Sequence, residues 1–189
     1  MIDMWCRQVM NVDVEARVKK MPYKNLKVLE ISGKEWKDFG FESYKSLAFP
    51  DFDICKQVTD EQFDLIIASQ VFEHIEDPEA AAENILKMLT PGGTFLITVP
   101  FMIKYHPSPL DMWRWTRQAL KFFLEKRGYT NVETFSWGNK ECMIANLEDW
   151  PKYDEERHSL INDEDYPVMV WGFAQRPKGK VSSLKSGKP

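Results

Sequence analysis

The segment from Tyr105 to Arg114 gathers side chains that can bind and activate an acceptor molecule. His106 can remove a proton near neutral pH, because the ordinary pKa of an imidazole is about 6.5. Tyr105 and Asp111 can orient a hydroxyl group, and the planar guanidinium of Arg114 suits an anionic or polyhydroxylated group. An ion pair between Arg114 and Asp111 that holds the loop is an alternative. We therefore expect His106, Tyr105 and Asp111 to be catalytic residues and Arg114 to bind substrate.

Tryptophans surround this segment, at positions 113, 115, 137 and 150. A tryptophan ring can stack on a sugar or an aromatic acceptor, and it can equally pack in a hydrophobic core. We take Trp113 and Trp137 as candidates for binding the substrate.

Acidic residues that could suggest a metal site are Glu73, Glu76 and Asp77. A second cluster of oxygen ligands is not evident in the sequence, and Asp77 precedes Pro78, as a helix-capping residue does. We therefore expect helix capping and no metal. The cysteines, Cys6, Cys55 and Cys142, are scattered and odd in number, which predicts neither a disulfide framework nor a zinc cluster and favours a cytoplasmic location.

The elements that must position these residues are clearest over residues 63–100. Residues 65–68 form a short apolar run typical of a strand buried on both faces. A helix follows from Pro78, with apolar residues at helical spacing, and a Pro-Gly-Gly turn leads to a second strand over 94–99. A strand, a crossover helix and a parallel strand connect in a right-handed way, so residues 69–76 are expected at the carboxyl edge of the sheet, where ligands bind.

Further strands are predicted at 26–31, 43–49, 132–137 and 168–174, and helices at the N-terminus, after Thr116 and at 142–150. The last two strands lack a clear crossover, which indicates a mainly parallel sheet with an antiparallel edge. We expect one domain over 1–175, with an insertion or lid at about 138–167.

Charge is distributed unevenly along the 189 residues. The net charge is −4, yet residues 176–189 hold five basic side chains and no acidic one, which leaves about −9 on the rest. Such an acidic body is a poor general binder of nucleic acid. We expect the tail at 176–189 to be flexible, and no apolar run is long enough to span a bilayer.

Several motifs together resemble the class I S-adenosylmethionine-dependent methyltransferases of the small-molecule group. They are Val28-Leu29-Glu30-Ile31, Phe63-Asp64-Leu65-Ile66-Ile67-Ala68-Ser69, Val71-Phe72-Glu73-His74-Ile75, Leu89-Thr90-Pro91-Gly92-Gly93 and the segment from His106 to Thr116. The resemblance implies a Rossmann-like α/β fold with a mostly parallel seven-stranded sheet, an antiparallel edge strand and helices on both faces. It also implies S-adenosyl-L-methionine as the cofactor.

The same resemblance implies a set of cofactor-binding residues, which are Glu30, Ser32, Gly33, Asp53, Ser69, Gln70, Val71 and His74. The first loop departs from the family pattern, because Ser32 to Trp36 holds a single glycine where a run of glycines is usual. We expect O-methylation of a small molecule, with a sugar hydroxyl as one acceptor. The alternatives are a methyltransferase-like domain that has lost catalysis and serves as a binding or regulatory subunit, and a nucleotide-sugar or dinucleotide enzyme. The last is disfavoured because no GxGxxG follows the first strand.

Overall fold

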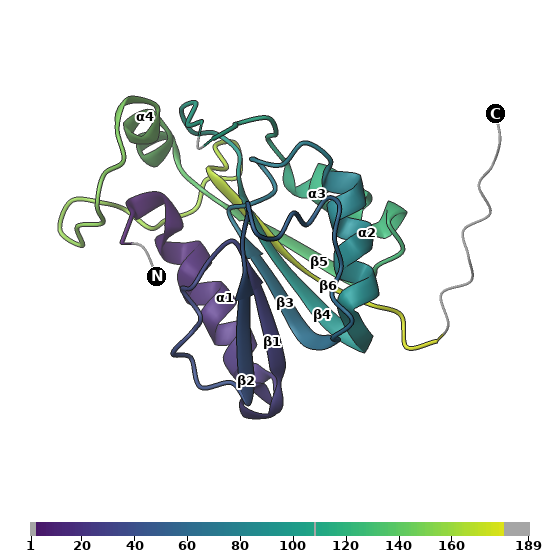
Figure 1. The fold of residues 1–189 in the computed structure, drawn as a ribbon. Coiled ribbons are helices and arrows are strands. Elements are labelled where there is room, and N and C mark those ends of the chain that lie inside the picture. Colours follow the sequence, from purple (N-terminus) through teal and green to yellow (C-terminus); the bar gives the residue numbers. More distant parts are fainter. Residues whose placement is uncertain (1–2, 108, 180–189) are drawn as a thin grey trace.

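A computed structural model describes residues 3–107 and 109–179, which form a six-stranded sheet between helices (Figure 1). The strand order is β2-β1-β3-β4-β6-β5. In chain order the strands are β1 (Lys27–Ile31), β2 (Ser43–Leu47), β3 (Phe63–Ser69), β4 (Leu89–Pro100), β5 (Thr130–Trp137) and β6 (Met169–Gln175). The strands β1 to β4 run parallel, and β6 pairs antiparallel with both β4 and β5.

Helices cover both faces of this sheet (Figure 1). The apolar side chains of α2 (Pro78–Met88) and α3 (Arg117–Lys126) pack on one face. Those of α1 (Gln8–Lys20) pack on the other, joined by Cys142 of α4 (Lys140–Glu148). Two short 3-10 helices, Trp5–Arg7 and Tyr23–Asn25, flank α1. This arrangement confirms the Rossmann-like α/β fold.

Local sequence signals explain where the helices begin and end. The side chains of Asp77, Thr116 and Asn139 each accept a hydrogen bond from a backbone amide in the first turn of α2, α3 and α4. Gly128 follows α3 with φ at +88°, a left-handed conformation that glycine adopts without strain. These caps fix where the loops at the sheet edge start.

The sheet differs from the expected one in its number of strands. Within the described residues it has six strands rather than seven, and these are the six that the residues themselves predict. The stretch from 48 to 62 holds turns and no strand, so β2 forms the edge, and the short connection from β1 to β2 contains only turns. The Pro-Gly-Gly segment also differs, because β4 begins at Leu89 and includes it.

The segment after β6 is held at its start. Arg176 donates through its guanidinium to the carbonyls of Lys87 and Leu89, and its amide donates to Gly93. Arg176 is therefore anchored to α2 and β4. The flexible tail expected over 176–189 stays a prediction, and its part beyond 179 lies outside the described residues. In the part of the chain that the structure describes, no helix has the length and apolar character needed to cross a membrane.

Candidate active site

The buried carboxylate of Glu30, near the carboxyl end of β1, organises the loop that follows. It accepts hydrogen bonds from the amides of Glu35 and Trp36, both at 3.1 Å, and from the Tyr44 hydroxyl at 2.5 Å. Burial and the neighbouring Glu30 raise the pKa of Tyr44, so its hydroxyl stays a donor. Glu30 thus shapes the candidate cofactor loop.

The loop itself makes a tight turn at Ser32 and Gly33. Ser32 has φ at +57° and donates its amide to Leu47, and the Gly33 carbonyl accepts from the Ser46 hydroxyl at 2.5 Å. A Cβ atom on Gly33 would lie 2.2 Å from Oε1 of Glu30, so any larger residue would force the Glu30 carboxylate to shift away from its donors. Trp36, which stands where the family usually has glycine, turns into the core and packs against Phe39.

The next polar groups at this edge come from the end of β3. The hydroxyls of Ser69 and Thr98 lie 3.2 Å apart, and Gln70 donates its side-chain amide to Thr98 at 3.0 Å. Gln70 has φ at +56°, and its buried Oε1 has no hydrogen-bond partner within residues 3–107 and 109–179. Val71 is buried in the core beside them. A ligand that donates a hydrogen bond would satisfy Gln70.

Asp53 lies in the turns after β2. Its carboxylate accepts from the Cys55 amide at 3.0 Å and pairs with Lys56 at 2.8 Å, and the lysine holds the pKa of Asp53 below its usual range. The next residue, Ile54, is tied to α2 because its carbonyl accepts from the Asn84 side chain. Asp53 therefore stabilises its own turn, and its role with a cofactor stays a prediction.

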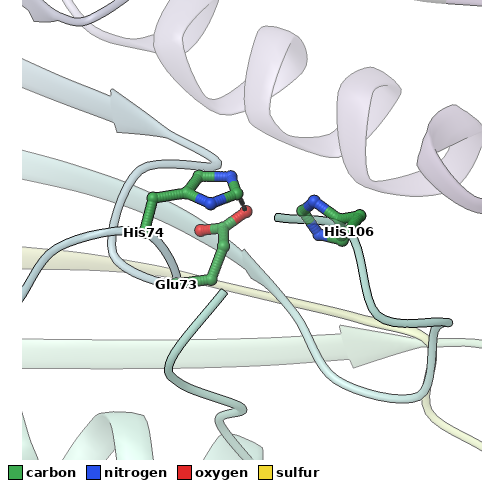
Figure 2. A group of neighbouring side chains, drawn as sticks. All are labelled: Glu73, His74 and His106. Atoms are coloured by element: carbon green, nitrogen blue, oxygen red, sulfur yellow. Dashed lines mark ion pairs between the residues drawn. The ribbon is translucent and has the colours of Figure 1, made fainter. Parts of the chain in front are cut away.

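Three side chains meet where the loops after β3 and β4 approach each other (Figure 2). They are Glu73, His74 and His106, whose ligand atoms all lie within 4.8 Å of one another. Nε2 of His74 is 3.7 Å from Oε1 of Glu73. The rings of His74 and His106 meet edge to face, with their centroids 5.0 Å apart. The indole of Trp150 also contacts the His106 ring edge to face, with the ring centroids 5.5 Å apart.

Burial dominates the electrostatics of this cluster. Glu73 is fully buried, which raises the pKa of its carboxyl to about 8, although Arg7 and Arg114 oppose the shift. Burial also lowers the pKa of His106, so its imidazole is mainly neutral at pH 7 and can accept a proton.

Hydrogen bonds and an ion pair hold together the loops that follow β3 and β4. The Glu73 carbonyl accepts from the amide of Met112 at 2.7 Å. Asp111 binds both terminal nitrogens of Arg114 and also accepts from the His106 amide at 2.8 Å. Arg114 lowers the pKa of Asp111 to about 2, so this carboxylate is ionised and holds His106 in place.

The other predicted acceptor-binding residues are spread more widely. Tyr105 is 70% exposed at the rim of the loop. Trp113 is partly exposed and donates its indole N–H to the Ile75 carbonyl. Trp137 is buried in the core and donates to Leu160, so its ring is not available to stack on an acceptor. Arg114 is engaged by Asp111, which is the alternative that the sequence left open.

The structure adds Glu73, Arg7 and Trp150 to the residues expected from the sequence. Glu73 stands beside His74 in the Glu-His-Ile motif, and that motif was a signal in the sequence for this region. The burial of the Glu73 side chain, however, depends on the packing of two loops that are distant in the sequence. Arg7 comes from the 3-10 helix before α1, and Trp150 lies within the insertion, just after α4. Neither could be placed from local spacing.

Two hollows of the surface lie away from this cluster. One is lined by residues of α1, β5 and β6, including Arg17 and Gln175, and the other lies between Arg17 and α3. Neither hollow includes a residue of the cluster or of the loop after β1.

Comparisons with known proteins agree with this architecture. A family model described as a methyltransferase domain matches residues 4–134. No curated protein matches the chain.

Among solved structures, a phosphoethanolamine N-methyltransferase 2 of Haemonchus contortus, in complex with phosphomonomethylethanolamine and S-adenosylhomocysteine, superposes with a TM-score of 0.58 at 15% identity. The match covers 88% of this chain and 52% of that one, so this chain spans about half the length of that enzyme.

Two other neighbours are covered almost completely. A SAM-dependent methyltransferase of Archaeoglobus fulgidus has a TM-score of 0.56 and 16% identity, with 87% of this chain and 93% of that chain covered. A chain from the complex of the Haloferax volcanii Trm112 activator with a methyltransferase has a TM-score of 0.58 and 14% identity, with 94% and 96% covered. At such identities the likeness shows the fold. Because the family model matches more than half of its length, this chain belongs to the methyltransferase domain family.

Proposed function

We propose that the protein transfers the methyl group of S-adenosyl-L-methionine to a hydroxyl of a small-molecule acceptor, with His106 as the general base. The observation that carries the proposal is the position and state of His106. It follows β4 at the carboxyl edge, its ring is partly exposed, and burial lowers the pKa of its imidazole. A neutral imidazole beside an acceptor can remove a hydroxyl proton.

Binding of the cofactor is supported by the chain at the ends of β1 and β3. Ser32 and Gly33 form a tight turn without bulky side chains, and Trp36 turns away into the core. The unpartnered Oε1 of Gln70 lies one strand away and suits a donor on the ligand, such as a hydroxyl or an ammonium group. Ser32, Gly33, Ser69 and Gln70 are the residues that would hold the cofactor, which supplies an electrophilic methyl group.

The transfer is an in-line displacement in which the protein mainly aligns the reactants. When bound, the cofactor would supply a methyl carbon that an acceptor oxygen can displace from sulfur, and the electrons of the carbon–sulfur bond would stay on sulfur and cancel its charge. The hydroxyl proton passes to His106. Asp111 keeps the His106 backbone in place, and Trp150 covers one edge of its ring.

A sugar acceptor has less support than a hydroxyl in general. The expectation rested on Arg114 and the tryptophans, but Arg114 is paired with Asp111 and Trp137 is in the core. The Haemonchus contortus neighbour is named as an N-methyltransferase, so amine acceptors belong in the same assay. We also infer a cytoplasmic setting, supported by the three cysteines, which are all free.

The test measures formation of S-adenosylhomocysteine with matched panels of hydroxyl and amine acceptors. His106→Gln should reduce kcat by about 100-fold or more with hydroxyl acceptors, because a positioned base contributes about that much. Its affinity for S-adenosyl-L-methionine, measured by calorimetry, should stay unchanged. His158→Gln is the matched control, since His158 stacks on Trp5 outside the cluster. Unchanged turnover in His106→Gln would rule out His106 as the general base. Turnover with amine acceptors alone would overturn the proposal of O-methylation.

A further inference from the structure

Two acceptor atoms face each other at the centre of the cluster without a donor between them. The backbone carbonyl of Leu110 lies 2.5 Å from Nδ1 of His74. A carbonyl oxygen can only accept, so Nδ1 carries the proton and Nε2 of the neutral ring presents its lone pair. That lone pair lies 3.7 Å from the carboxylate of Glu73.

The carboxylate of Glu73 has no other partner that would explain its burial. Its side chain is fully buried, and neither oxygen has a hydrogen bond within the described part of the chain. Burying an unpaired carboxylate is costly unless it binds a cation or takes up a proton. The two facing acceptors therefore require either a shared proton or a bound cation between them.

His106 supplies a third donor atom from the other loop. All three ligand atoms lie within 4.8 Å of one another, and Figure 2 shows both rings next to the Glu73 carboxylate. Ligand atoms about 2.1 Å from a tetrahedral ion are about 3.4 Å apart, so no pair has to close by more than about 1.4 Å. Side-chain rotation of the partly exposed His106 can provide that movement.

We propose that Glu73, His74 and His106 bind one divalent transition-metal ion of the zinc type, with a fourth position open to a ligand. Two imidazoles and one carboxylate form a ligand set suited to zinc and its neighbours, whereas magnesium prefers oxygen ligands alone. The hydrogen bond from Nδ1 of His74 to a backbone carbonyl is the contact that orients metal-binding histidines in proteins.

The surrounding charges are compatible with one such ion. Asp111 neutralises Arg114, and Arg7 remains as a nearby positive group that influences Glu73. The Nε of Arg7 is buried and lacks a hydrogen-bond partner among the described residues. One ion of charge +2 with one carboxylate leaves a single net positive charge, which favours an oxygen or anionic ligand in the open position.

A catalytic use of the ion rests on the proposed function, but its binding does not. A divalent ion lowers the pKa of an oxygen placed next to it. With an ion bound, His106 would be a ligand, and the ion would lower the pKa of a hydroxyl in the open position enough for its proton to pass to water. Without the ion, His106 stays free to act as the base of the proposed function. Metal binding can therefore be measured without cofactor or acceptor.

The experiment titrates the chelator-treated full chain with Co²⁺ and follows the visible absorption bands, with calorimetry using Zn²⁺ in parallel. We expect one ion per chain. Glu73→Gln and His106→Asn should each weaken affinity by at least about 100-fold, more than is typical of a residue that only orients a ligand. Glu76→Gln, in the same loop but exposed, and His158→Asn should bind as the wild type does. Circular dichroism confirms that each variant is folded.

The possible results separate this proposal from the proposed function. Absence of Co²⁺ bands and of Zn²⁺ heat at millimolar metal overturns the metal site, and so does unchanged affinity in both His106→Asn and Glu73→Gln. Metal binding without methyl transfer supports the site and contradicts the proposed function. Full methyl transfer in chelator, with no metal binding in calorimetry, supports the proposed function and overturns the site.

Discussion

Two buried glutamates of this fold, Glu30 and Glu73, have the same exposure and opposite surroundings. Both are fully buried, near the carboxyl ends of the neighbouring strands β1 and β3. Glu30 accepts three hydrogen bonds, two from loop amides and one from Tyr44, whereas Glu73 accepts none within residues 3–107 and 109–179. A buried carboxylate with all its donors stabilises the fold, and one without them is a candidate for binding a ligand.

Removing Glu30 should have the largest effect on stability. Glu30→Ala removes the acceptor of two amides and of the Tyr44 hydroxyl, which keeps only a longer contact with the Gly33 carbonyl. At about 1 to 3 kcal/mol for each lost buried partner, we expect the free energy of unfolding to fall by at least about 3 kcal/mol. Urea denaturation measures it. Glu73→Ala is the matched comparison, and an equal loss in both variants would abolish the contrast between the two residues.

Gly33→Ala should have the next largest effect. The added Cβ would overlap Oε1 of Glu30 at 2.2 Å, and Glu30 is held in place by its three donors. Forcing a methyl group into such a packed site costs about 1 to 3 kcal/mol. Affinity for S-adenosyl-L-methionine should fall as well, as calorimetry would show. Gly179→Ala, with no atom within 4 Å of the added methyl, is the control and should match the wild type.

Glu73→Gln should change the pH dependence of the free energy of unfolding more than its value at any one pH. The folded pKa of about 8 lies above the unfolded value of about 4.3. The metal-free wild type is therefore stabilised most below pH 4.3 and loses that contribution as the pH rises towards 8.

Glutamine does not titrate, so the variant should lose less stability between pH 5.5 and pH 8 in urea denaturation with a chelator. Glu76→Gln should keep the wild-type slope. Equal slopes in wild type and Glu73→Gln would mean that Glu73 is ionised throughout.

The fold could be predicted from the sequence because its signals are local. Apolar runs, the cap at Asp77 and the glycine at 128 define strands and helices over short windows, and all six strands were expected near their observed positions. The seventh strand was inferred from the family resemblance alone, and the short chain between β2 and β3 does not form it.

The site was harder to predict because it depends on contacts between distant loops. His74 and His106 were named from the sequence, but their meeting over Glu73 requires two loops to pack together. Whether Arg114 pairs with Asp111 or faces an acceptor depends on side-chain conformation, and the sequence allowed both. The buried state of Trp137 is likewise set by its contact with the insertion.

The shortened sheet also bears on how the protein behaves at high concentration. With no strand beyond it in the described residues, β2 presents an unpaired row of backbone donors and acceptors, which can pair with another copy and start aggregation. The strand is five residues long and carries Lys45, whose ammonium pairs with Glu61 at 2.5 Å. A short edge strand with a charged side chain resists such pairing. The sheet therefore has one strand fewer than the family resemblance implies, and its edge strand β2 is still protected from aggregation.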